Sequence, residues 1–387
     1  MNPLHLLGLI AVLALLAYAL VRRKPGGESA AARPDERSGD RPGFSRTAVD
    51  TGVSLPTAAA PPETARPNPR QVMPASLREF EWKTAESLPE SRREQMLAEL
   101  KKTPPPPRAF YQLVSQDFVA RASSAELAEL VMGVPMAATK VLARANSAYY
   151  GLQRPVGSLG QAITLLGLNT VRTICLQYMM EASFKAHAPA LRQRFDHLWA
   201  ASAIAGELSQ KLAQRLQLPE AGGLVTEVAL SSLGHFAAAT LMPREGDAPS
   251  NQSLLARAWA EQTQLGAPAA EIGALLMHAW TLPETLVEEV RAIDRVLVTP
   301  ARRVDPQHDL RLAVSYLSAR LGERVARGDA VNLGDYEQSV LSGDDYFHLR
   351  ASLSPDQHQR LQDVLQSAEI VRALHDLVEA LREPSVR

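Results

Sequence analysis

Two His–Asp dipeptides, His308-Asp309 and His375-Asp376, are the residues of this chain whose types could hold a metal ion. A neutral imidazole beside a carboxylate offers two ligand atoms, and a metal held in this way can activate a bound water. His375, however, shares a predicted helix with three nearby leucines. We therefore interpret it as a residue at the edge of a packing face rather than as a ligand.

Motifs for other kinds of chemistry are missing from the sequence. Cys175 is the only cysteine, so a disulfide framework and a cysteine-based zinc site are excluded, and a reducing compartment is favoured. The chain has no G-x-x-x-x-G-K-[ST] phosphate loop, no G-x-G-x-x-G loop after a strand and no nucleophile elbow. Composition alone leaves Ser/His/Asp catalysis open.

The charge distribution argues against a nucleic-acid partner. The formal net charge is -1 and the pI is about 6.8. The basic pairs Lys101-Lys102 and Arg302-Arg303 are too short to form a binding patch, and we interpret them as parts of a solvated face.

Composition and periodicity predict an all-α protein. Hydrophobic residues make up 46% of the 387 residues, which is enough for a packed core, and aromatic residues only 5%. No segment shows sustained period-two alternation. Helix-start patterns are frequent: Ser123-x-x-Glu126 and Ser158-x-x-Gln161 are predicted capping boxes, and Asn169 and Ser354 are predicted N-caps.

An apolar stretch at residues 4–21 predicts a transmembrane helix, because about 18 apolar residues can span a bilayer. Arg22, Arg23 and Lys24 follow it, and no Lys or Arg precedes it, so the charge rule places the rest of the chain in the cytoplasm. A cleaved signal peptide is the alternative, since Ala17-Tyr18-Ala19 fits a cleavage site. A signal peptide, however, carries its positive charge before the apolar stretch.

The remaining chain divides into four parts by composition. Residues 22–75 are rich in Pro, Ala, Arg, Ser and Gly and predict a disordered linker. Residues 76–103 predict a short helical segment, residues 104–300 the main helical domain, and residues 301–387 a C-terminal helical extension. The extension carries an apolar stripe that we interpret as core or a helix-pair contact.

The strongest motif block of the main domain runs from Val141 to Tyr150 and contains Asn146-Ser147-Ala148. It continues as Ser158-Leu159, then Ala162-Ile163-Thr164-Leu165-Leu166-Gly167. This order and spacing resemble the HDOD domain, a catalytically degenerate relative of the HD metal-dependent phosphohydrolases. The resemblance covers about residues 104–294 and implies a multi-helix HD-like bundle. One departure is Val134-Pro135, where the family usually has Asp-Pro.

Further motif residues of the family carry a structural or a binding role that the sequence leaves open. Asn146, Ser147 and Ala148 could end a helix by local bonding and close packing, or could contact a ligand. The same two interpretations hold for the remaining motif residues, which are Trp199, Ser202, Gly234, Trp280 and Pro283.

The resemblance also locates the positions that bind metal in true HD enzymes. Ala201 stands where the first metal-binding His is expected, Ser231-Ser232 where the His-Asp pair is expected, and Ile293-Asp294 where a His-His often follows. Alanine supplies no ligand atom and a serine hydroxyl is a poor ligand. We therefore expect no metal, no other cofactor and no phosphohydrolase activity.

Three neighbouring histidines do not change this expectation. His197, His235 and His278 lie near the motifs but not at the ligand positions. We interpret them as partly buried or surface histidines, and a pH-sensing role is not favoured.

The function expected from the resemblance is a non-catalytic signal-transduction or regulatory module of a bacterial inner membrane, with a single membrane pass. It would act by binding a signalling protein or a small ligand. The alternative is a divergent metal-dependent phosphohydrolase or phosphodiesterase with a rebuilt site. A third hypothesis is a ligand sensor that keeps a nucleotide-shaped cavity without the metal.

Overall fold

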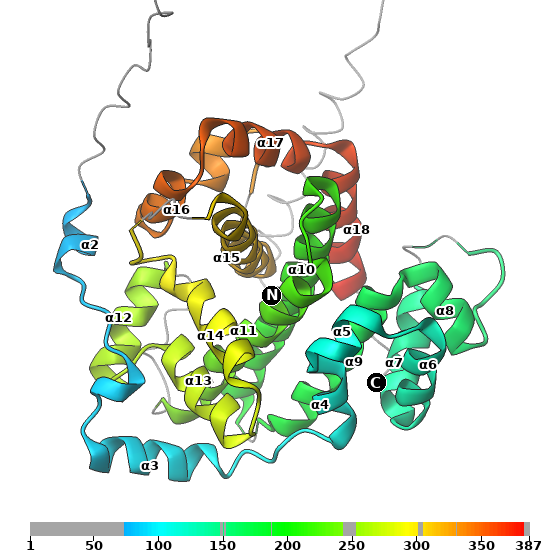
Figure 1. The fold of residues 1–387 in the computed structure, drawn as a ribbon, viewed down its shortest axis with the longest axis horizontal. Helices are drawn as coiled ribbons and strands as arrows, with labels where there is room; N and C mark the ends of the chain where they lie inside the picture. The colour runs from blue at the N-terminus through cyan, green and yellow to red at the C-terminus, as the bar shows by residue number, and fades with distance from the viewer. Residues whose placement is uncertain are drawn as a thin grey trace, which may run out of the picture. The chain divides into compact units, whose positions relative to one another are not determined.

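The computed structural model describes residues 73–147, 150, 152–186, 188–242, 253–300, 305–329 and 331–382. The predicted membrane helix at 4–21 and nearly all of the predicted linker lie outside the described residues. The described residues all belong to one unit, 68–387. They contain helices and no strand, which confirms the all-α prediction (Figure 1).

The first half of the described chain consists mainly of short helices. These are α2 Ala75–Glu79, the 3-10 turn η1 Ala85–Ser87, α3 Glu90–Leu100, α4 Arg108–Val114, α5 Gln116–Arg121, α6 Ser124–Met132, α7 Pro135–Ala145, α8 Leu159–Leu166 and α9 Leu168–Ser183. The second half begins with α10 Pro189–Leu216, the longest of the described helices. It continues with α11 Ala221–Leu241, α12 Leu254–Leu265, α13 Ala269–Ala279, α14 Glu284–Arg295, α15 Pro306–Ala326, the π-helical turn η3 Tyr336–Val340, the 3-10 turn η4 Asp344–Tyr346, α16 Phe347–Ser352, α17 Pro355–Leu365 and α18 Ala368–Arg382.

Several helix starts follow from the capping residues. Ser123 and Ser354 form the complete capping boxes of α6 and α17. At α8 the Ser158 hydroxyl accepts from the Gln161 amide, but the Gln161 side chain accepts from the Gly157 amide instead of closing the box. These capping side chains accept hydrogen bonds from backbone amides of the first helical turn, which have no partner within the helix.

The predicted cap at Asn169 is wrong. α9 begins at Leu168, so Asn169 lies inside its first turn, and Gly167 is the N-cap residue with φ 83°. A glycine adopts this left-handed φ without the steric cost of a side chain. Gly167 therefore lets the chain turn directly from α8 into α9, whose axes differ by 113°.

Helices α10 and α11 lie between two hydrophobic clusters. One cluster joins α3–α9 to the second half of α11 and to α13 and α14. The other joins α10 and the first half of α11 to α15–α18. Among the described residues, one unbroken helix, α11, is long and apolar enough to cross a membrane. Of its apolar stretch, however, 89% is buried inside the protein. It is therefore a core helix here.

Three glycines let helices cross in backbone contact. A Cβ added to Gly234 of α11 would lie 2.2 Å from the Ala269 carbonyl oxygen, at the start of α13, and Gly273 of α13 faces Gly234 from the other side. On α15, a Cβ at Gly322 would lie 2.5 Å from the Ala201 carbonyl oxygen of α10. These crossings fix how α10, α11, α13 and α15 approach one another.

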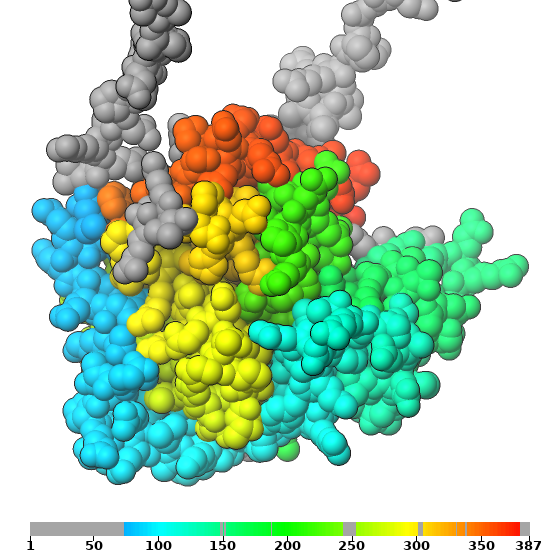
Figure 2. Space-filling view, viewed as in Figure 1, coloured from blue at the N-terminus to red at the C-terminus, as the bar shows by residue number. Residues whose placement is uncertain are grey.

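The segment before α3 is bound to the helices α13 and α14. The buried Glu271 carboxylate accepts from Trp82 Nε1 at 2.7 Å and from the Ala85 amide at 3.0 Å, and it also pairs with Arg291. Figure 2 shows this segment (blue) running along the yellow helices. A buried charge with this many partners holds the chain firmly from Trp82 onward.

Candidate functional site

The positions that correspond to the HD metal ligands come together in the fold. Ala201 of α10 and Ser231 and Ser232 of α11 line one small pocket of about 20 Å³. His235, one turn after Ser231, and Arg320 of α15 line the same pocket. The resemblance therefore identified positions that share one place in the structure.

The hydroxyls at this place are engaged in local hydrogen bonds. Ser231 Oγ donates to the Val228 carbonyl and Ser232 Oγ donates to the Ala229 carbonyl, each at 2.8 Å. Ser202 Oγ lies 3.4 Å from Ser232 Oγ. Bonds of this type hold a hydroxyl against its own helix. Together with the methyl group of Ala201, they leave these positions without an imidazole or a carboxylate, the ligand types of the HD enzymes.

A buried ionic cluster lies beside this pocket and is formed by His235, Arg257, Asp294, Arg320 and Glu323. Arg320 binds Asp294 at 3.0 Å and Glu323 at 3.1 Å, while Arg257 binds Glu323 at 2.8 Å. His235 Nε2 lies 3.2 Å from Asp294 Oδ2 and 3.7 Å from Glu323 Oε1. Each carboxylate therefore faces at least one guanidinium group.

The electrostatics of the ionic cluster keep both carboxylates charged. Burial alone raises the pKa of Asp294, but Arg320, His235 and Arg257 outweigh burial and hold this pKa well below its usual range. For Glu323, burial is again opposed by Arg257 and Arg320, and the pKa is lowered. The charges of two carboxylates and two guanidinium groups thus balance each other.

Sequence reasoning missed the ionic cluster. His235 was expected to be partly buried or on the surface, but it is only 7% exposed and belongs to the cluster. Its position three and four residues after Ser232 and Ser231 could have placed it on their helix face. No pattern in the sequence linked it to Arg257, Arg320 or Glu323, because these lie on other helices.

A larger pocket of about 100 Å³ shares Leu198, Ala201, His235 and Glu323 with the small pocket. Four helices contribute to its wall: α10, α11, α12 and α15. Its lining combines charged and aliphatic side chains, namely Arg194, His197, Leu198, Ala201, His235, Met242, Arg257, Ala260, Glu261, Glu323, Ala326 and Arg327. We call it the Arg194 pocket.

Asn146 lies away from the ionic cluster and closes a loop. It is the C-cap residue of α7. Its Oδ1 accepts from the Val156 amide at 2.6 Å and its Nδ2 donates to the Val156 carbonyl at 3.0 Å. The side chain thereby joins the end of α7 to the segment before α8. The neighbouring motif residue Ser147 makes no side-chain hydrogen bond to the described residues, and Ala148 lies outside them.

The remaining motif residues belong to packing contacts. Trp199 stacks on Phe236 with ring centroids 4.0 Å apart. Trp280 is buried and packs edge-on against Phe110, and Pro283 is the N-cap residue of α14. Of the predicted motif residues, Ser202 lines the small pocket and Gly234 forms the α11–α13 crossing.

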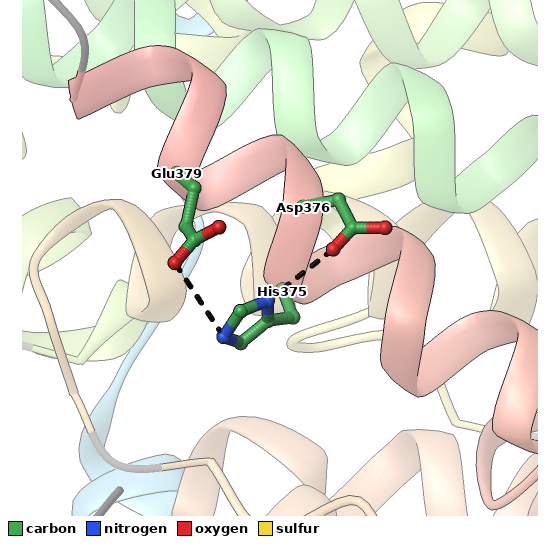
Figure 3. Close-up of side chains that lie close together, drawn as sticks. All are labelled: His375, Asp376 and Glu379. Atoms are coloured by element: carbon green, nitrogen blue, oxygen red, sulfur yellow. Dashed lines mark hydrogen bonds and ion pairs between the residues drawn. The ribbon is translucent and has the colours of Figure 1, made fainter. Parts of the chain in front are cut away.

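The dipeptide His375-Asp376 lies on α18 together with Glu379 (Figure 3). His375 Nδ1 is 3.3 Å from Asp376 Oδ1, and Nε2 is 3.8 Å from Glu379 Oε1. Within the described part of the chain, these three side chains form the group of His, Asp or Glu residues whose possible metal-ligand atoms all lie within 4.8 Å of one another. The His375 and Glu379 side chains are exposed and come from one helix, so the group has the character of a solvated face.

Comparison with known proteins assigns the class of domain. The family model described as the HDOD domain matches residues 104–296. The chain therefore contains an HDOD domain, which covers the helices from α4 to α14. The matched range includes Ala201, Ser231 and Ser232 and three members of the ionic cluster, namely His235, Arg257 and Asp294. No curated protein matches the chain.

Several solved structures are similar to this chain. An HDOD domain protein of unknown function from Geobacter sulfurreducens is 16% identical, with a TM-score of 0.52 over 76% of this chain and 99% of that chain. A candidate signal transduction protein from Marinobacter aquaeolei VT8 is 18% identical, with a TM-score of 0.46 over 79% and 64%. A candidate phosphohydrolase from Shewanella amazonensis SB2B is 19% identical, with a TM-score of 0.45 over 74% and 97%. The likeness to the Geobacter sulfurreducens protein, with a TM-score above 0.5, shows the fold alone.

Proposed function

We propose that this protein is a non-catalytic signal-transduction module that acts by binding a signalling protein or a small ligand. The observation that carries the proposal is the charge balance of the ionic cluster: Arg320 and Arg257 neutralise Asp294 and Glu323. Ala201, Ser231 and Ser232 add no ligand at the corresponding HD positions.

The physical argument concerns the charge that a metal would have to displace. A divalent ion binds carboxylates and neutral imidazoles that are free to coordinate it. Here both carboxylates are already held by guanidinium groups at 2.8–3.1 Å. A metal would have to move two buried cations away from their partners, and a buried cation that loses its partner costs several kcal/mol. The arrangement favours a fixed binding scaffold over a centre that activates water.

The test is metal analysis of the purified full-length protein, combined with assays of phosphomonoester and phosphodiester cleavage. We expect no stoichiometric metal and no cleavage that a chelator abolishes. The triple variant Ala201→His, Ser231→His, Ser232→Asp restores the ligand types and is the matched comparison; it should bind more metal than the unmodified protein. Stoichiometric metal together with chelator-sensitive cleavage in the unmodified protein would overturn the proposal.

A divergent metal-dependent phosphohydrolase is the second candidate, and one observation favours it. His235 Nε2 lies close to two carboxylates, those of Asp294 and Glu323, next to a pocket. Imidazole and carboxylate are ligand types of such enzymes. In that case His235→Ala should abolish both metal binding and phosphoester cleavage. The non-catalytic proposal expects the unmodified protein to show neither metal binding nor cleavage.

We also propose that the module is held at the inner face of a bacterial cytoplasmic membrane. The support is the apolar segment 4–21 followed by Arg22, Arg23 and Lys24. A membrane anchor of this type limits the partner to proteins or ligands near that surface. A pull-down from membranes with the full-length protein is the experiment that identifies the partner.

A further inference from the structure

The Arg194 pocket has a wall of aliphatic side chains. Leu198 comes from α10, Met242 follows α11, Ala260 belongs to α12 and Ala326 ends α15. Together with Ala201 they form a surface without hydrogen-bonding side chains. A surface of this kind suits the apolar body of a small molecule.

Arg194 supplies a positive charge at the same pocket, and the buried Glu261 interacts with it electrostatically. The other two arginines of the pocket have carboxylate partners: Arg257 binds Glu323 at 2.8 Å and Arg327 binds Asp329 at 3.0 Å. For Arg194 no described carboxylate lies within ion-pair distance of 4.0 Å. Arginine keeps its charge in proteins, and its planar fork matches phosphate and carboxylate oxygens.

The buried acidic residue of the pocket lining, Glu261, is compatible with an incoming anion. Glu261 is buried there, and its carboxylate accepts from the Ala269 amide at 2.7 Å. Burial raises the pKa of Glu261, although His235 and Arg257 oppose this, so the group holds a proton more readily than an exposed glutamate and repels an anion less. Arg257 Nε is buried and has no hydrogen-bond partner among the described residues.

We propose that the Arg194 pocket binds a small organic anion: its phosphate or carboxylate group pairs with Arg194, and its apolar body lies against Leu198, Met242 and Ala260. The proposal rests on the non-catalytic function proposed above and names the class of ligand for it. The ligand is recognised by a guanidinium group and an aliphatic wall, and no metal takes part.

The test uses calorimetric titration of the full-length protein with four probes. Inorganic phosphate is the head group alone, adenosine is a body without charge, adenosine monophosphate combines phosphate with a body, and octanoate combines carboxylate with an aliphatic body. We expect at least one of the two combined probes to bind more tightly than phosphate and adenosine. Tighter binding of adenosine monophosphate would indicate a phosphate ligand, and tighter binding of octanoate a carboxylate ligand.

Arg194→Gln is the decisive variant, and Arg192→Gln is its matched control, because Arg192 is exposed on the same helix two residues away. Arg194→Gln should weaken binding of the combined probe about tenfold or more, because it removes a charge-assisted hydrogen bond. Arg192→Gln should change this affinity by less than about twofold. Ala260→Leu enlarges a side chain of the aliphatic wall into the pocket and should weaken binding of the combined probe. Thermal unfolding of each variant verifies that the fold is intact.

The proposal is overturned if no probe binds, if Arg194→Gln binds as tightly as the unmodified protein, or if Arg192→Gln loses as much affinity as Arg194→Gln. Metal content and phosphoester cleavage are measured in the same preparations. Chelator-sensitive cleavage would refute the non-catalytic function, and absence of Arg194-dependent binding would refute the ligand class, so the two failures are distinguishable.

Discussion

Arg320 of α15 donates a hydrogen bond of 3.0 Å to the Asp294 carboxylate at the end of α14, and both side chains are buried. Asp294 stands where the HDOD resemblance places one of a pair of histidines, and Arg320 lies beyond the matched domain at 104–296. The helix α15, outside the family match, thus supplies the cation that neutralises a site position inside it.

Asp294→Asn should reduce the free energy of unfolding at pH 7 by about 3–5 kcal/mol, because it leaves Arg320 buried with less counter-charge. The exposed Asp196→Asn is the control and should change it by no more than about 0.5 kcal/mol. Urea denaturation of both variants and the unmodified protein measures the difference.

The pH dependence of this effect has a definite sign. The pKa of Asp294 is lower in the folded protein than in the unfolded chain, where it is about 3.9. Its contribution to stability is therefore present above that value and is lost as the pH falls toward the folded pKa. The gap between the unmodified protein and Asp294→Asn should narrow below about pH 4. A gap that stays constant from neutral to acidic pH would contradict the lowered pKa.

Asn146→Ala should destabilise the protein by about 1–2 kcal/mol, because it removes both hydrogen bonds to the Val156 backbone. Asn146→Asp is the matched variant: it keeps an acceptor for the Val156 amide but loses the donor, so an intermediate loss is expected. Thermal and urea denaturation test the order of the three proteins. Unchanged stability combined with lost ligand or partner binding would instead make Asn146 a contact residue.

Gly234→Ala should destabilise by about 3 kcal/mol or more, since its Cβ would lie 2.2 Å from the Ala269 carbonyl oxygen and would push α11 and α13 apart. Gly160→Ala on α8 is the control, because no atom lies within 4 Å of its Cβ position. That change should be neutral or stabilising by up to about 1 kcal/mol. Equal stability of the two variants would show that the helix crossing tolerates a side chain.

Residues 4–21 should remain in the mature protein, with the chain from Arg22 onward in the cytoplasm, because the lone basic cluster follows the apolar segment. A reporter at the C-terminus should be active only in its cytoplasmic form, and moving the basic cluster to the position before residue 4 should lower that activity. Loss of the N-terminal segment from the mature protein, seen by mass spectrometry, would support the signal peptide instead.

Residues 25–75 should be cleaved rapidly in limited proteolysis and leave a resistant fragment that begins near Ser76. The contacts of Glu271 with Trp82 and Ala85 predict that cleavage stops before Trp82. N-terminal sequencing of the resistant fragment measures its start. A fragment that retains residues 25–75 would show that this stretch is a structured part.

The sequence by itself determined the helices, because helix formation depends on residues three and four positions apart and on local caps. Ser123 and Ser354 predicted two helix starts correctly, and the motif from Asn146 to Gly167 identified the domain that the family model then matched. The exception, Asn169, failed because Gly167 could adopt a backbone conformation that starts α9 two residues earlier.

Only the tertiary structure decided the nature of the site. Ala201, Ser231 and Ser232 indicated which ligand types are missing at the positions matched to the HD metal ligands. Arg257, Asp294 and the Arg320–Glu323 pair, however, lie on three different helices, whose packing the sequence could not predict. Their pairing depends on how α12, α14 and α15 pack around α10 and α11. Gly234 permits the close approach of α13 to α11, and Gly322 permits that of α15 to α10. Buried charges act over a few ångströms in space, and that distance is fixed only when the helices pack.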